Sequence, residues 1–130
     1  MTPYQKLKHL IIEKSAQVDE EIYVPFPIIS SNIDEIYDEL FDNYADTMSD
    51  ISYELREGEV ETDILCDYSR HYETKSVAVK TLDGSYVGWT YFFGGGKHSE
   101  PEAVPWKEYS YNLDCHEEEK LVVVRTFKKI

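Results

Sequence analysis

The chain has 130 residues, of which 42% are apolar and 14% aromatic, and its net charge is −13. This composition suits one domain with one core and excludes a globally disordered chain. The charge excludes nucleic acid and an anionic membrane as direct partners, because phosphate groups would be repelled. No apolar run approaches the ~18 residues that span a bilayer, and no signal peptide is recognisable. We therefore expect a cytoplasmic protein whose Cys66 and Cys115 are free thiols.

Helical patterns dominate the first sixty residues. Thr2 followed by Pro3 is typical of a helix N-terminus, and apolar residues at helical spacing predict a helix over residues 3–15. Two prolines in "YVPFPIISS" exclude a helix and a central strand there. This connector is expected to dock aromatic and aliphatic side chains on the core, namely Tyr23, Phe26 and Ile28 or Ile29.

A second helix is predicted from residue 32 to about residue 55, with a break near Ser49. Apolar residues recur there in steps of three and four, and Ser31 and Asp34 have capping-box spacing. Gly58 is a suitable C-terminal stop.

Strand patterns replace helical ones from Glu61 onward. Alternating or β-rich runs include "TDILCDYSRHYE", "KSVAVKT", "WKEYSYNLDC" and "KLVVVRTF", and Asp83-Gly84 predicts a hairpin turn. The fold class is therefore α+β: two N-terminal helices packed on a four- or five-stranded antiparallel meander, in a single domain over residues 1–130. Residues 1–60 would form its acidic helical part and residues 61–130 its sheet. The inner face of the sheet would include Val77, Val79, Val87, Trp89, Tyr91 and Phe93.

The negative charge is concentrated in residues 34–63, which hold twelve acids and a single base, Arg56. Asp34, Asp38, Asp42 and Asp46 step by four, which on one helix gives a row with about 6 Å between neighbours. Such a row can imitate a nucleic-acid backbone and bind a basic protein surface. The alternative is a solvated face that raises solubility. The predicted partner-binding residues are Asp34, Glu35, Asp38, Glu39, Asp42 and Asp46, with Tyr37 or Tyr44 as an aromatic anchor.

A second candidate site follows from "WTYFFGGGKHSEPE", residues 89–102. Three glycine N–H groups can form an anion-binding concavity, and a lysine and a histidine add positive charge. The phosphate-loop pattern is absent, so the alternative is a tight connection between strands. The candidate ligand-binding residues are Arg70, His71, Gly94, Gly95, Gly96, Lys97, His98 and Trp106.

Metal and catalytic motifs are not recognisable. The cysteines and histidines lack the spacing of standard zinc modules, and Cys66 and Cys115 continue apolar faces, which favours buried thiols. No nucleophile motif is present. We expect no catalytic residue, no metal and no cofactor; enzymatic activity stays open, but a binding protein is favoured.

The segment "SRHYETKSVAVKTLDGSYVGWTYFFGGGKHSEPEAVPW" resembles a family of small uncharacterised proteins carried by phages, prophages and their bacterial hosts. Trp89–Tyr91, Gly94–His98, Pro101–Glu102 and Trp106 match its Trp-Thr-Tyr strand, Gly-Gly-Gly-Lys-His loop, Pro-Glu pair and tryptophan. The resemblance covers roughly residues 69–128. It implies a setting among the accessory genes of mobile elements and assigns no functional residue.

Three functions are therefore expected in order. The first is a non-enzymatic binding protein of phage or mobile-element type, which inhibits a host defence or nucleic-acid-handling protein through its acidic helix, as a nucleic-acid mimic. The second is a small-ligand or nucleotide-binding module, or a weak enzyme, that uses residues 94–98. The third is an immunity or antitoxin protein that masks a basic toxin. The second function requires a small ligand, whereas the first and the third require a basic protein surface as partner.

Overall fold

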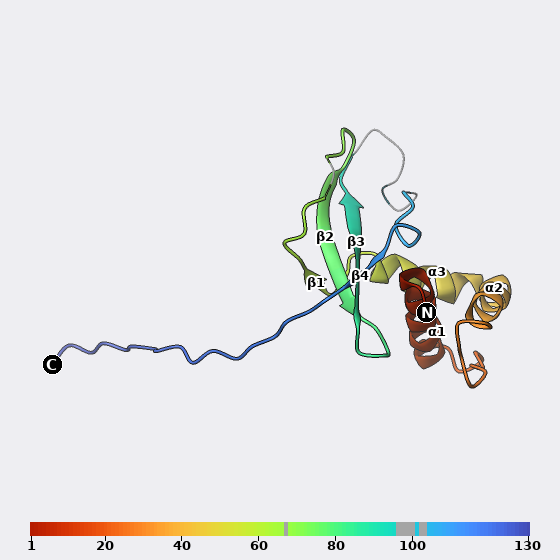
Figure 1. The fold of residues 1–130 in the computed structure, drawn as a ribbon, viewed down its shortest axis with the longest axis horizontal. Coiled ribbons are helices and arrows are strands. Elements are labelled where there is room, and N and C mark those ends of the chain that lie inside the picture. Colours follow the sequence, from red (N-terminus) through yellow and green to blue (C-terminus); the bar gives the residue numbers. More distant parts are fainter. Residues whose placement is uncertain (67, 96–100, 102–103) are drawn as a thin grey trace.

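The structure, a computed structural model, describes residues 1–66, 68–95, 101 and 104–130. Within these residues, three helices precede a four-stranded antiparallel sheet, which confirms the α+β class (Figure 1). The elements are α1 (Pro3–Val18), α2 (Ile33–Asn43), α3 (Ala45–Leu55), β1 (Val60–Glu61), β2 (Glu73–Lys80), β3 (Tyr86–Phe93) and β4 (Tyr111–Leu113).

Helix α1 begins where the sequence predicts. The Thr2 hydroxyl accepts a hydrogen bond from the Gln5 backbone N–H, and the Gln5 side chain accepts one from the Thr2 backbone N–H. This reciprocal pair satisfies two of the N–H groups that a helix N-terminus leaves open, and Pro3 needs no partner at the first position. The helix continues to Val18, three residues beyond the prediction.

The second predicted helix is two helices, and the break lies at Tyr44 rather than near Ser49. Tyr44 has φ −135° and ψ 47°, which interrupts the helical backbone between α2 and α3. Its hydroxyl donates to the Glu21 carbonyl oxygen at 3.1 Å. The bend lets both Leu40 of α2 and Met48 of α3 reach the core.

The start of α2 and the preceding connector differ from the prediction. Asn32 is the N-cap residue, and the Asp34 carboxylate accepts from Lys8 and Gln5 of α1 instead of closing a capping box with Ser31. In the connector Ile28 packs against the core, as expected. Three other side chains point outward and are largely exposed: Tyr23, Phe26 and Ile29.

The sheet is a meander with strand order β1-β2-β3-β4. Strands β2 and β3 form the predicted hairpin, with Val77 opposite Trp89 and Val79 opposite Val87. Asp83 fixes the turn by accepting from the Ser85 backbone N–H and from two hydroxyls. These hydrogen bonds hold the pKa of the Asp83 carboxyl well below its usual value.

The outer strands are shorter than the sequence pattern indicates. β1 has two residues and β4 three, and residues 114–130 have no strand partner among the described residues. Because the chain leaves the sheet after Leu113, Cys115 is exposed. Tyr109, which precedes β4, is 75% exposed. The expectation of a buried Cys115 is therefore wrong, and Cys66 is only partly buried.

The core lies between the helices and one face of the hairpin. Trp89 is fully buried and packs in a tilted arrangement against Trp106, which comes from the segment before β4; the ring centroids are 4.8 Å apart. Lys107 extends this contact by donating to the Ser52 hydroxyl of α3 at 2.8 Å. Val77, Val79, Val87 and Trp89 are buried as predicted, while Tyr91 and Phe93 are partly buried and stack on each other.

Arg56, at the C-terminus of α3, joins the helices to the sheet. Its guanidinium donates to the Phe92 carbonyl oxygen at 2.8 Å and lies about 5 Å from the ring centroids of Tyr53 and Tyr91. Its own carbonyl accepts from the Trp89 indole N–H at 2.8 Å. Arg56 is 5% exposed and has no carboxylate partner among the described residues.

We predict that Arg56→Met lowers the free energy of unfolding by about 2–4 kcal/mol, because a charge-assisted hydrogen bond and two cation–π contacts are lost. Urea denaturation measures this change. Arg70→Met is the matched control, since Arg70 is exposed and should tolerate the substitution. Equal stability of the two variants would contradict the role given to Arg56.

Candidate functional site

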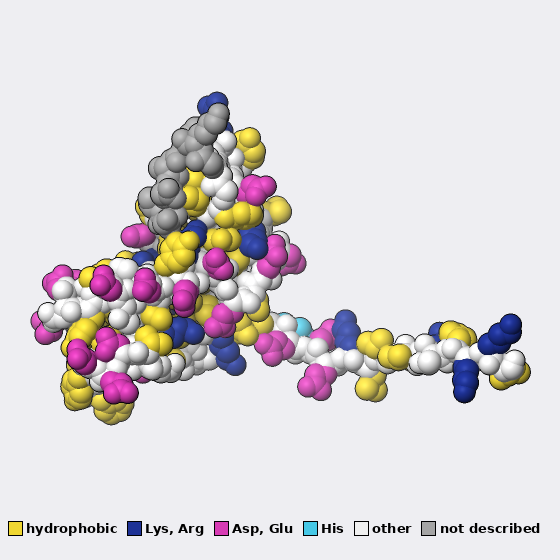
Figure 2. Space-filling model, turned by 180° about the vertical axis from the view of Figure 1, so that it is seen from behind, with side chains coloured by type: hydrophobic (Ala, Val, Ile, Leu, Met, Phe, Trp, Pro, Cys, Tyr) yellow, Lys and Arg dark blue, Asp and Glu magenta, His cyan; other side chains and the backbone are white. Residues whose placement is uncertain are grey.

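The helical part of the molecule presents an acidic surface (Figure 2). Five of the six predicted partner-binding acids are exposed and have no ion-pair partner among the described residues: Glu35, Asp38, Glu39, Asp42 and Asp46. An ordinary exposed helix places bases between its acids, because opposite charges three or four residues apart stabilise it. α2 and α3 contain no base at all.

The nearby bases are turned inward. Arg56 reaches into the sheet, as described above, and Lys8 of α1 is 8% exposed between the rings of Tyr4 and Tyr37. The Lys8 ammonium lies 3.0 Å from the Asp34 carboxylate. Positive charge therefore stabilises the interior contacts of the helices and leaves the outer surface acidic.

Asp34 belongs to a contact between helices. Its carboxylate accepts from Lys8 at 3.0 Å and from the Gln5 side chain at 3.3 Å. The hydrogen bond from Lys8 holds the pKa of this carboxyl below its usual value, Gln5 adds to the effect, and partial desolvation opposes it. Asp34 thus holds α2 against α1, and its charge is already neutralised.

The break between α2 and α3 changes the predicted row of four carboxylates. Asp42 ends up in the last turn of α2 and Asp46 in the first turn of α3, where the helix dipole favours a negative charge. Both line a hollow of about 350 Å³, together with Asp19 from the end of α1. We name this hollow the acidic notch; its lining is Asp19, Asp42, Asn43, Tyr44, Ala45, Asp46 and Thr47.

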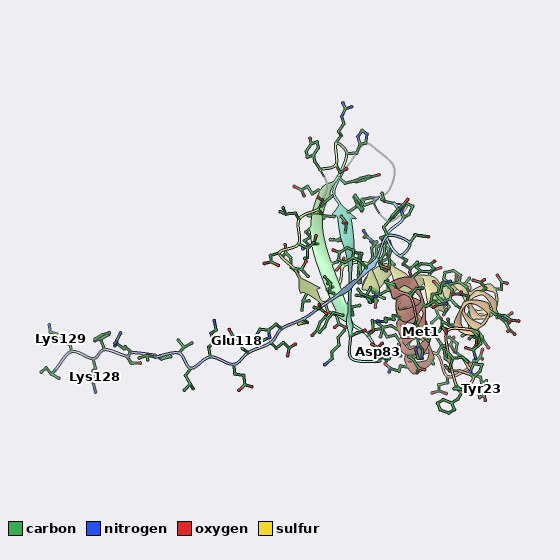
Figure 3. All side chains as sticks on the ribbon, viewed as in Figure 1. Met1, Tyr23, Asp83, Glu118, Lys128 and Lys129 are labelled. Atoms are coloured by element: carbon green, nitrogen blue, oxygen red, sulfur yellow. The ribbon has the colours of Figure 1, made fainter. Side chains whose placement is uncertain are left out.

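A smaller, more apolar hollow of about 240 Å³ adjoins the acidic notch, and Asn43 and Tyr44 line both. Its wall includes Ile36 and Leu40 of α2 and Tyr23 of the connector. Tyr23 is 78% exposed, and its side chain extends outward at the edge of the helical part (Figure 3). A basic side chain in the notch would therefore lie beside an aromatic and aliphatic surface.

The aromatic anchors differ from the prediction. Tyr37 is 6% exposed, and burial, with nearby Tyr4 and acidic groups, raises the pKa of its hydroxyl, so this ring belongs to the core. Tyr44 is half-buried and its hydroxyl is engaged. Tyr23 is an accessible aromatic residue in the wall of the adjoining hollow. Sequence reasoning missed it because it assigned Tyr23 of the connector to the core.

A second, larger hollow of about 730 Å³ lies beside β3. It brings together three of the predicted ligand-binding residues, Arg70, His71 and Trp106. We name it the β3 hollow; its lining is Tyr68, Ser69, Arg70, His71, Thr90, Phe92, Val104, Pro105, Trp106 and Tyr109. The aromatic walls and one guanidinium suit a planar ligand with a negative group.

The described glycines of the loop have a packing role. Gly94 and Gly95 have φ of 71° and 87°, in the left-handed region that favours glycine. A Cβ atom on Gly95 would lie 2.5 Å from the His71 carbonyl oxygen, so only glycine fits beside this residue. Gly96, Lys97 and His98 lie outside the described residues.

Cys66 and Thr74 are in side-chain contact at 3.4 Å, while the Cys115 thiol lies 3.8 Å from the Glu117 carboxylate. Among the described residues, no three acidic, histidine or cysteine side chains gather closely enough to hold a metal ion. None of the described helices combines the length and apolar character needed to cross a membrane.

Comparisons of this chain with protein-family models, curated proteins and solved structures give no match.

The contact of Asp34 with Lys8 predicts a pH-dependent contribution to stability. Because the pKa of Asp34 is lower in the folded chain than in the unfolded one, its contribution is complete above the unfolded pKa of about 4 and is lost as the pH falls through the folded value. Urea denaturation should show Asp34→Asn less stable than the wild type at pH 7 by up to about 1 kcal/mol, since the carboxylate is largely exposed. This difference should shrink toward pH 2. The matched control is Asp38→Asn, which removes an exposed carboxylate of the same helix that has no ion-pair partner among the described residues.

Proposed function

We propose that this chain is a non-enzymatic binding protein that docks a basic protein surface on α2, α3 and the acidic notch. The proposed setting is a phage or mobile element, and the proposed partner is a host defence or nucleic-acid-handling protein that the chain inhibits by occupying a basic groove. An immunity protein that masks a basic toxin would use the same surface.

The location of Arg56 carries this proposal. Arg56 is the one base among residues 34–63, and it is 5% exposed. The outer surface of this segment therefore carries acids without interleaved bases. Self-repulsion on such a surface costs stability, and a basic partner would relieve it.

The acidic notch gives this surface a shape as well as a charge. Asp19 directly follows α1, and Asp42 and Asp46 lie in α2 and α3, so a lysine or arginine in the notch would meet acidic residues from three parts of the helical region. Tyr23 and the adjoining apolar hollow supply the area from which an interface gains most of its affinity. The charges would raise the association rate and the salt dependence of binding.

We predict that reversing Asp38, Asp42 and Asp46 to lysine removes binding of the basic partner without unfolding the chain. The three residues are exposed and have no ion-pair partner in the described part of the chain, so circular dichroism should show the wild-type fold. The measurement is capture of host-lysate proteins on immobilised protein, at low and at high salt. Proteins held by the proposed surface should be eluted by salt and by duplex DNA.

The matched control reverses three exposed acids of the sheet part, Glu61, Asp63 and Glu73, to lysine. Both variants have the same net charge, so only the position of the charge differs. The control should keep its captured proteins. If both variants lost their captured proteins equally, net charge alone would explain the loss. Full binding by the Asp38, Asp42 and Asp46 variant would overturn the proposal.

The β3 hollow supports a second candidate function, the binding of a small ligand. The observation that supports this function is that Arg70, His71 and Trp106 line one aromatic cavity. A nucleotide fits this chemistry, since its base would stack on aromatic rings and its phosphate would contact Arg70. Trp106 would report binding directly, because its ring lines the cavity and packs against Trp89.

Titration with nucleoside mono-, di- and triphosphates should change the tryptophan fluorescence if the β3 hollow binds them. Arg70→Ala should weaken that response, by about tenfold if the guanidinium contacts the phosphate. The matched control is Arg125→Ala, which removes an arginine outside the hollow. The absence of any fluorescence change across the series would rule out this second function.

A further inference from the structure

Residues 114–130, which we name the arm, leave the edge of the sheet after β4 and extend away from the body (Figures 1 and 3). Its apolar side chains are at least 78% exposed: Leu121, Val122, Val123, Val124, Phe127 and Ile130. The described contacts of the arm with the body come from its first residues, where Glu117 accepts from the Tyr86 hydroxyl. With six exposed apolar side chains in an extended segment, the arm resembles a β-strand that has no partner strand.

The charges of the arm are separated along its length. Its acids come first, at Asp114, Glu117, Glu118 and Glu119, and the apolar run Leu121–Val124 follows. The bases are Lys120, Arg125, Lys128 and Lys129, so three of the four follow the apolar run. The order is thus acidic, apolar, basic.

This order makes the arm complementary to itself in one direction. Two arms that run antiparallel place the acidic end of each opposite the basic end of the other, and bring the two valine runs together. Opposite charges across a strand pair stabilise it, and like charges destabilise it. Two parallel arms would set acid against acid and base against base.

We propose that the arms of two copies of this chain pair as antiparallel strands and form a symmetric dimer. Val123 lies at the centre of the pair, so Glu118 of each copy lies opposite Lys128 of the other, and Glu119 lies diagonally across from Lys129. Such a pair has the two-fold symmetry of most homodimers, in which the same surface serves both partners. Because each arm continues β4, the pair connects two four-stranded sheets.

The alternative sites for the arm are less suited. The acidic helical surface would attract its basic end, but it would repel Glu117, Glu118 and Glu119. β1, the other edge of the chain's own sheet, is separated from β4 by two strands and is flanked by Glu59 and Asp63. Among the surfaces compared in the described part of the chain, a second arm alone offers bases to the acidic end, acids to the basic end and an apolar centre.

Sedimentation velocity of the full chain tests the proposal. A two-stranded contact is weak, so we expect a mass that rises from monomer toward dimer between micromolar and millimolar protein. Two charge-reversed variants, Glu118→Lys with Glu119→Lys and Lys128→Glu with Lys129→Glu, should each stay monomeric. An equimolar mixture of the two variants should dimerise again, because the lysines introduced at positions 118 and 119 of one arm then meet the glutamates introduced at positions 128 and 129 of the other.

The matched control reverses Glu20 and Glu21, two exposed acids away from the arm, and should dimerise like the wild type. A wild-type chain that is monomeric at every concentration would overturn the proposal. So would a dimer that survives in the Glu118 and Glu119 variant, since the arm would then bind something other than a second arm. A mixture that stays monomeric would overturn it as well.

A cysteine crosslink tests the direction of pairing. In a chain with Cys66→Ser and Cys115→Ser, Val123→Cys should form a disulfide-linked dimer under mild oxidation, because the antiparallel pair brings this position close to itself. Glu118→Cys in the same chain should crosslink at least tenfold less, since it lies far from its own copy. Equal crosslinking of the two would indicate parallel pairing and overturn the proposal.

Discussion

The contacts of Arg56 are the point on which the arrangement of helices and sheet depends. One residue donates to the backbone of β3, accepts from the indole of the largest buried side chain and places its charge against two tyrosine rings. It therefore orients the end of α3 relative to the hairpin. A buried guanidinium is costly unless its hydrogen bonds and aromatic contacts compensate for lost water. The Arg56 Nε has no hydrogen-bond partner among the described residues, so this compensation is incomplete.

The same contact determines the electrostatic character of the surface. Arg56 and Lys8 are buried, and Lys107 is held against Ser52 with the pKa of its ammonium lowered by burial. Positive charge is thus used between elements, while carboxylates remain outside. This division explains how a chain with an acidic surface forms a core, and it is the reason for proposing a basic protein as the partner. Folding and the proposed function depend on the same placement of bases.

The general architecture could be predicted because it follows from periodicity. Apolar spacing indicated α1 and the hairpin, and Thr2, Pro3 and the Asp83-Gly84 turn marked their ends. The details that failed depend on tertiary contacts. The Tyr44 break depends on a hydroxyl bond to the Glu21 carbonyl across the connector, and the exposure of Cys115 depends on where the chain leaves β4. The alternation of apolar and polar residues in the sequence predicts neither the break at Tyr44 nor the exposure of Cys115.

The candidate site could be predicted in part for the same reason. Charge counting located the acidic segment, and the steps of four correctly placed Asp38 and Asp42 on one helix. The sequence did not show that Lys8, twenty-six residues earlier, would neutralise Asp34, or that Tyr37 would be buried. The acidic notch was also hidden, because Asp19 follows α1 while Asp42 and Asp46 lie on either side of the break at Tyr44, and the three line one hollow only in the folded chain.

Amide chemical-shift mapping is the most direct test of the acidic surface. The probe is a short arginine-rich peptide added to the full chain at low salt, followed in proton–nitrogen spectra. We predict that the largest shifts fall on the acidic notch, around Asp42, Asp46 and Asp19, and on Tyr23, and that they disappear at high salt. Shifts of equal size over all acidic segments, including Glu57–Asp63 and Glu117–Glu119, would contradict a defined docking surface, and so would the absence of shifts.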